Sequence, residues 1–99
     1  MNPLTPDHLL RFASTLEGEE LPTAGGRATF TVRVLRRGFE VTPRSAGKAR
    51  VIPLRKIEQI LGEYEQSRSG RPGNYTSSTF DASYILTLID RYLREERGP

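Results

Sequence analysis

The sequence contains no cysteine, no tryptophan and a single histidine. Without cysteine, disulfides and thiolate metal sites are excluded, which fits a reducing compartment. No apolar run approaches the length of a membrane-spanning helix, and the first ten residues lack the basic start and apolar stretch of a secretion signal. A chain of 99 residues suffices for one domain with a modest core. We therefore expect a single cytoplasmic domain, residues 1–99, without a membrane segment.

Residues for catalysis are also scarce. His8 falls in the first turn of an expected helix, a position more typical of a surface residue than of a base or metal ligand. The segment Ala46-Gly47-Lys48 is not a phosphate-binding loop, because Thr42 stands where that motif needs glycine and Ala49 where it needs Ser or Thr. Paired acidic residues fall on expected solvated helix faces. We expect no enzymatic activity, no metal and no cofactor.

The positive charge of the chain is concentrated in its middle third. Residues 27–56 carry nine basic residues against one acidic residue, a net charge of +8. Residues 1–26 and 57–99 carry net charges of −3 and −2, so that the total is +3. Thirteen of the fifteen basic residues are arginine, which contacts phosphate or carboxylate with two donors at once. The middle third is therefore the candidate binding region.

Helical periodicity of apolar residues predicts three helices, over residues 6–16, 53–66 and 79–96. The first has a clear start, with Thr5 as N-cap and Pro6 at the first helical position, and Gly18 is its expected stop. Residues 67–78 are rich in serine and glycine, and we expect them to form a mobile loop.

Between the first two helices the apolar period changes from 3.6 to 2, which predicts strands over residues 28–36, 39–44 and 48–52. The expected fold is α+β, a three-stranded antiparallel meander packed against helices, in the order α-β-β-β-α-α. A two-residue loop at Arg37-Gly38 places Val34 opposite Val41. This register puts the apolar residues of the first hairpin on one face of the sheet.

The second turn has two possible lengths. A two-residue loop would place Arg50 on the core face. A three-residue loop with Gly47 in the left-handed conformation pairs Val41 with Val51 and keeps Arg50 in solvent, and we prefer it for that reason. The expected inward residues are Phe30, Val32, Val34, Phe39, Val41 and Val51. The expected outward residues are Arg33, Arg44, Lys48 and Arg50.

This basic face is the leading candidate for a nucleic-acid interface, because arginines on an antiparallel ribbon can contact a phosphate backbone. The residues assigned to it are Arg33, Arg44, Ser45, Lys48 and Arg50, extended by Arg68, Arg71 and Tyr75 of the loop. Three alternatives remain. The face could simply be solvated, it could bind an acidic protein as an accessory, inhibitor or immunity-type module, and Tyr75 could anchor its loop instead of stacking on a base.

The third helix carries two apolar stripes, which indicates either deep burial or a homodimer interface. The chain resembles double-stranded-RNA-binding domains only in the order of its helices and strands. Where those domains have a basic stretch of small residues, at the start of the second helix, this chain has Ile52-Pro53-Leu54-Arg55-Lys56. Order by itself does not indicate a function.

Overall fold

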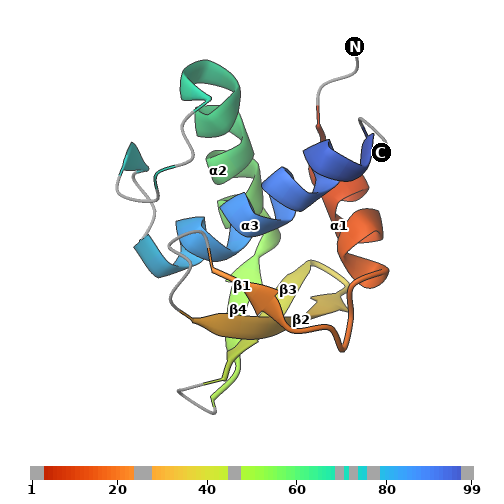
Figure 1. The fold of residues 1–99 in the computed structure, drawn as a ribbon. Coiled ribbons are helices and arrows are strands. Elements are labelled where there is room, and N and C mark those ends of the chain that lie inside the picture. The colour runs from red at the N-terminus through yellow and green to blue at the C-terminus, as the bar shows by residue number, and fades with distance from the viewer. Residues whose placement is uncertain are drawn as a thin grey trace.

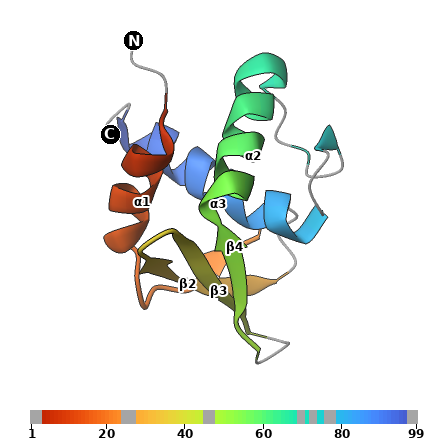
Figure 2. The same cartoon turned by 180° about the vertical axis from the view of Figure 1, so that it is seen from behind.

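The computed structural model describes residues 4–23, 28–44, 48–68, 71, 74–75 and 79–96. It is an α+β fold in which three helices lie on one face of a four-stranded antiparallel sheet of order β1-β2-β3-β4 (Figures 1 and 2). The elements are α1 (Pro6–Ser14), β1 (Leu21–Pro22), β2 (Thr29–Leu35), β3 (Gly38–Pro43), β4 (Arg50–Pro53), α2 (Leu54–Ser67) and α3 (Thr79–Glu96).

The α+β class is confirmed, but the sheet has four strands where three were predicted. Leu21 and Pro22 form β1, which pairs with Phe30 and Thr29 of β2. A strand of two residues is too short to show an alternating pattern, so no sequence signal marks it. Leu21 is fully buried, and this burial holds β1 on the sheet. The element order is therefore α-β-β-β-β-α-α.

The helices begin and end close to their predicted bounds. At the start of α1, the Thr5 hydroxyl accepts a hydrogen bond of 3.2 Å from the backbone N–H of His8. The helix ends at Ser14, two residues earlier than predicted, and Gly18 with a φ of +85° redirects the chain toward β1. The second helix runs one residue later than predicted at each end, and α3 has its predicted bounds.

The first hairpin keeps its predicted faces but turns at a different place. Val34 pairs with Phe39 and Val32 with Val41, so the turn residues are Arg36 and Arg37 rather than Arg37 and Gly38. The predicted pairing was thus wrong by two residues. Because side chains alternate with a period of two, an even shift leaves every residue on its predicted face.

The second hairpin departs from prediction by one residue, which exchanges the faces of β4. Glu40 pairs with Val51, and Val41 pairs with Arg50. Ile52 is fully buried, whereas Val51 is 57% exposed. The predictions of an inward Val51 and an outward Arg50 were therefore wrong. The β4 side chain that fills the core is Ile52, and Arg50 points toward the helices, where it contacts a carboxylate.

The core lies between the sheet and the three helices, and α3 runs across both α1 and α2 (Figures 1 and 2). Residues 81–89 of α3 are all buried. The ring of Tyr84 packs on Phe30 with centroids 4.8 Å apart, and Leu88 is fully buried. Deep burial therefore accounts for both apolar stripes over residues 81–89, whereas Tyr92 and Leu93 are half-buried. None of the described helices is long and apolar enough to cross a membrane.

Gly38 is required at the start of β3 for two reasons. Its φ is +153°, and a Cβ atom there would overlap the carbonyl oxygen of Ile52 and lie 3.1 Å from the Cα of Pro53. We expect Gly38→Ala to lower the free energy of unfolding by at least about 2 kcal/mol in urea denaturation, because both the conformation and the strand spacing would have to change.

Gly62 provides a matched control for this substitution. It lies inside α2, and a Cβ atom there would meet nothing within 4 Å. Gly62→Ala should therefore stabilise the protein by up to about 1 kcal/mol. Equal effects of the two substitutions would contradict the close approach of β3 and β4 at Gly38.

Candidate nucleic-acid interface

The face of the sheet opposite the helices, here called the open face, is not continuously basic. Arg33 lies on it directly across from Glu40, on the neighbouring strand. Glu17 reaches the same region, where its carboxylate accepts a 2.7 Å hydrogen bond from the backbone N–H of Val34. Arg33, Glu17 and Glu40 line one shallow depression with Thr31 and Thr42. The net charge in the middle of the open face is therefore negative.

Two of the predicted cations lie at the end of the sheet near the β3–β4 turn. Arg44 forms an ion pair of 3.3 Å with Glu20, and both side chains are exposed, so the pair contributes little to stability. Lys48 is exposed and forms no ion pair with any described residue. Ser45 lies outside the described residues.

Arg50 faces the helices instead of the open face. Its Nε donates a 2.8 Å hydrogen bond to the carboxylate of Asp81, in the first turn of α3. The Nζ of Lys56, in the first turn of α2, donates a 3.1 Å hydrogen bond to the other oxygen. The Asp81 side chain is only 3% exposed, against 46% and 38% for its two partners. Arg50 and Lys56 therefore hold β4 and α2 to α3.

Among the loop residues that the structure describes, the one aromatic ring, that of Tyr75, is not exposed for stacking. Tyr75 is only 7% exposed, which favours the anchoring alternative for this residue. Arg68 ends α2 in the left-handed conformation, lies 5.6 Å from the centroid of the Tyr64 ring and pairs with Glu65 at 3.3 Å. Arg71 is exposed. Most of the remaining residues of the predicted mobile loop lie outside the described part of the chain.

The fold brings together three arginines that were not assigned to the site from the sequence. Arg36 and Arg37 form the β2–β3 turn, and the carbonyl of Arg37 accepts a 2.8 Å hydrogen bond from the N–H of Leu54, the first residue of α2. Arg55 follows in the first turn of that helix. We call Arg36, Arg37 and Arg55 the arginine corner. All three are exposed, and their side chains form no ion pair with any described residue.

The start of α2 adds to the positive potential of the arginine corner. Its N-cap is Pro53, which makes no side-chain cap, and no acidic residue lies in the first turn. The N-terminal end of a helix carries a partial positive charge, so a cation such as Arg55 is unfavourable there. An anion bound at the corner would relieve this repulsion. The sequence signal for the corner was the pair Arg55-Lys56 directly after Pro53, but its position beside Arg36 and Arg37 depends on the strand pairing.

Within the described ranges, no group of three or more His, Asp or Glu side chains could hold a metal ion. Compared with family models, curated proteins and solved structures, the chain has no match. The chemistry of the site therefore rests on its own geometry, an exposed set of arginines at one end of the sheet.

The Asp81 interactions predict that replacing Asp81 by asparagine lowers the unfolding free energy more than the same replacement of Asp90. Asp81→Asn would leave Arg50 and Lys56 without a charged partner, and we expect a loss of about 1–3 kcal/mol in unfolding free energy, reduced from the fully buried case because both cations are partly solvated. Asp90→Asn breaks only the exposed Arg94 pair and should cost less than about 0.5 kcal/mol. Equal losses in thermal or urea unfolding would contradict the anchoring role of Asp81.

Burial raises the pKa of the Tyr75 and Tyr84 phenols above the ordinary value of 10.0. For Tyr84, the Arg50 guanidinium lowers the pKa and Asp81 raises it, both less strongly than burial raises it. The unfolded chain therefore loses these protons first, so the stabilisation is complete below pH 10 and disappears as the pH rises through the folded-state pKa.

We accordingly expect the free energy of unfolding to fall above about pH 10, and to fall less steeply in Tyr84→Phe. Urea denaturation at a series of alkaline pH values measures the slope, and tyrosinate absorbance reports the ionisation itself. An identical slope in the wild type and in Tyr84→Phe would show that this phenol does not contribute.

Proposed function

We propose that the protein is a non-enzymatic module that binds the phosphate backbone of double-stranded nucleic acid through the arginine corner. The observation that carries the proposal is that Arg36, Arg37 and Arg55 lie at neighbouring backbone positions, are exposed and form no ion pair with any residue that the structure describes. Most other described arginines are neutralised by a nearby carboxylate, as Arg44 is by Glu20 and Arg50 by Asp81. The corner is therefore the surface that attracts a polyanion most strongly.

Phosphate suits this surface for reasons of geometry. A guanidinium donates two parallel hydrogen bonds to a phosphate, and neighbouring arginines can contact successive phosphates of one strand. Arg33 lies on the open face of β2, three residues before the turn, but Glu17 and Glu40 line the same depression, so Arg33 adds little to the contact. Lys48 and Arg44 lie at the opposite end of β3 and β4, where a longer nucleic acid would reach them. A cytoplasmic location is part of this proposal.

A double-stranded ligand is favoured over a single strand by the position of the aromatic rings. Proteins that bind single strands stack bases on exposed aromatic side chains. Among the described residues, the only exposed large apolar side chain is Val51. Phe30, Phe39 and Tyr84 are buried, and so is Tyr75. Backbone contacts by arginine do not need an exposed ring.

The proposal predicts binding that weakens steeply with salt. In fluorescence anisotropy with a labelled duplex, the triple substitution of Arg36, Arg37 and Arg55 by alanine should reduce affinity at low salt and make the slope of log K against log salt shallower by about 3. The hydrogen bond from Leu54 to Arg37 involves only backbone atoms, so the variant should keep its fold. Circular dichroism checks this.

A charge-matched control replaces Arg68, Arg91 and Arg94 by alanine. These arginines lie near the C-terminal ends of α2 and α3, away from the corner, and each has an acidic partner. Duplex affinity should change little in this variant. Equal losses in the two triple variants would contradict a specific role for the corner. If the wild type does not bind a duplex at micromolar protein and low salt, an acidic protein becomes the preferred partner.

A further inference from the structure

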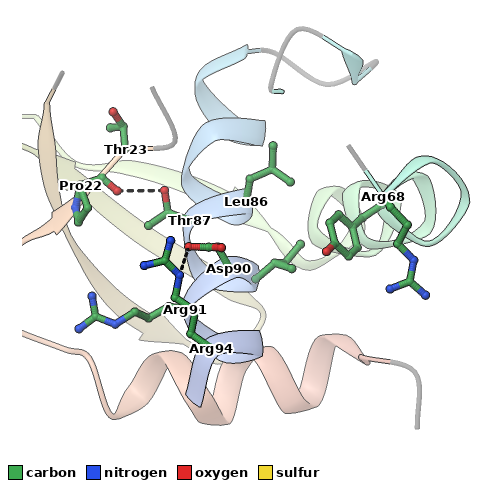
Figure 3. A pocket seen from close by; sticks show the side chains of 10 residues that line it. Pro22, Thr23, Arg68, Leu86, Thr87, Asp90, Arg91 and Arg94 are labelled. Atoms are coloured by element: carbon green, nitrogen blue, oxygen red, sulfur yellow. Dashed lines mark hydrogen bonds and ion pairs between the residues drawn. The ribbon is translucent and has the colours of Figure 1, made fainter. Parts of the chain in front are cut away.

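A second surface lies at the other end of α2. It is a pocket of about 450 Å³ between β1, the end of α2 and the outer side of α3 (Figure 3). This volume lies within the range of small-molecule sites in proteins. Along α2, Arg55 of the corner is separated from Tyr64 and Arg68 of the pocket by about 14 Å and about 20 Å. The two surfaces are separate.

The lining of the pocket is divided into an apolar part and a cationic part. Leu86 points from α3 toward α2 (Figure 3) and is buried with Ile89, and Tyr64 of α2 is half-buried beside them. On the side of α3 that faces β1 lie the guanidinium groups of Arg91 and Arg94 (Figure 3). A ligand that spans the pocket therefore meets apolar surface at one end and positive charge at the other.

The hydroxyl of Thr87 fixes the position of β1 at the cationic part. Its Oγ1 lies 3.0 Å from the carbonyl oxygen of Pro22 and 3.0 Å from that of Ser83, one turn earlier in α3. The wall formed by Pro22 and Thr23 is thus attached to the helix that carries the arginines. This part of the pocket is preformed.

Both arginines are held by exchangeable partners. Arg91 pairs with Glu19 at 2.7 Å, and Arg94 pairs with Asp90 at 3.0 Å. The Arg94 pair is largely exposed, at 76% and 61%, and such pairs are weak enough to open for a competing anion. Arg68, the third arginine of the lining, points away from α3 (Figure 3). Each of the three arginines has one carboxylate partner, namely Glu65, Glu19 and Asp90, so an anionic ligand has to displace a carboxylate in order to bind.

From this division we infer that the pocket binds a small aromatic anion, a flat apolar ring system that bears one sulfonate, carboxylate or phosphate group. The ring lies over Leu86 and Ile89 beside Tyr64. The anionic group accepts hydrogen bonds from Arg91 and Arg94. An inorganic anion would lack the apolar contacts, and a neutral ring would lack the charge-assisted hydrogen bonds, so each should bind more weakly.

The test is a titration of the full ¹⁵N-labelled chain, followed by NMR, with naphthalene-2-sulfonate as the probe. Shifts should concentrate on the amides of Thr23, Leu86, Thr87 and Asp90. Naphthalene-2-methanol is the neutral control ligand and inorganic sulfate is the control without a ring. Each should bind at least about tenfold more weakly than naphthalene-2-sulfonate. Their amide shifts show whether they occupy the same pocket.

The double substitution of Arg91 and Arg94 by glutamine should weaken binding of the sulfonate about tenfold, while the same change at Arg36 and Arg37 should not alter it. This pair of variants separates the pocket from the proposed nucleic-acid contact, which only the second variant should weaken. Equal binding of the neutral alcohol, unchanged affinity in the Arg91 and Arg94 variant, or shifts at the arginine corner alone would each overturn the assignment.

Discussion

The arrangement of β4, α2 and α3 depends on the hydrogen-bonded ion pairs of the Asp81 carboxylate. This carboxylate lies buried in the first turn of α3 and accepts hydrogen bonds from Arg50 of β4 and Lys56 of α2. An unpaired buried charge is costly, so these three side chains constrain one another. Because Arg50 must face Asp81, Ile52 faces the core and Val51 faces solvent. A backbone hydrogen bond from the N–H of Leu54 to the carbonyl of Arg37 holds the start of α2 beside the β2–β3 turn.

The parts of the fold that could be predicted are those encoded by neighbouring residues. Thr5 and Pro6 mark the start of α1, and the period of two in β2 and β3 sorts their faces correctly even though the pairing is shifted by two residues from the predicted one. The failure at Arg50 has a different origin. Keeping a charged residue in solvent is a sound rule for an isolated hairpin, but the residue that reverses it, Asp81, lies thirty-one positions further along the chain.

The candidate site was less predictable for the same reason. A charge excess of +8 over residues 27–56 indicates a basic region without indicating which of its arginines are free. Neutralising partners come from elsewhere in the chain: Glu20 reaches Arg44 from the segment before β1, and Asp81 reaches Arg50 from α3. Tyr75 was open to two interpretations from the sequence, and its burial favours the one in which it anchors its loop. What remains exposed and unpaired depends on the tertiary fold.

The positions of two prolines bear on whether this protein associates through the edges of its sheet. The outer strands of a sheet can recruit a strand from another molecule and start aggregation. Pro22 in β1 has no N–H to offer, and its carbonyl is already occupied by Thr87. Pro53 in β4 likewise lacks a donor, in a strand of only four residues. Both outer strands therefore offer few backbone donors to a strand of a second copy.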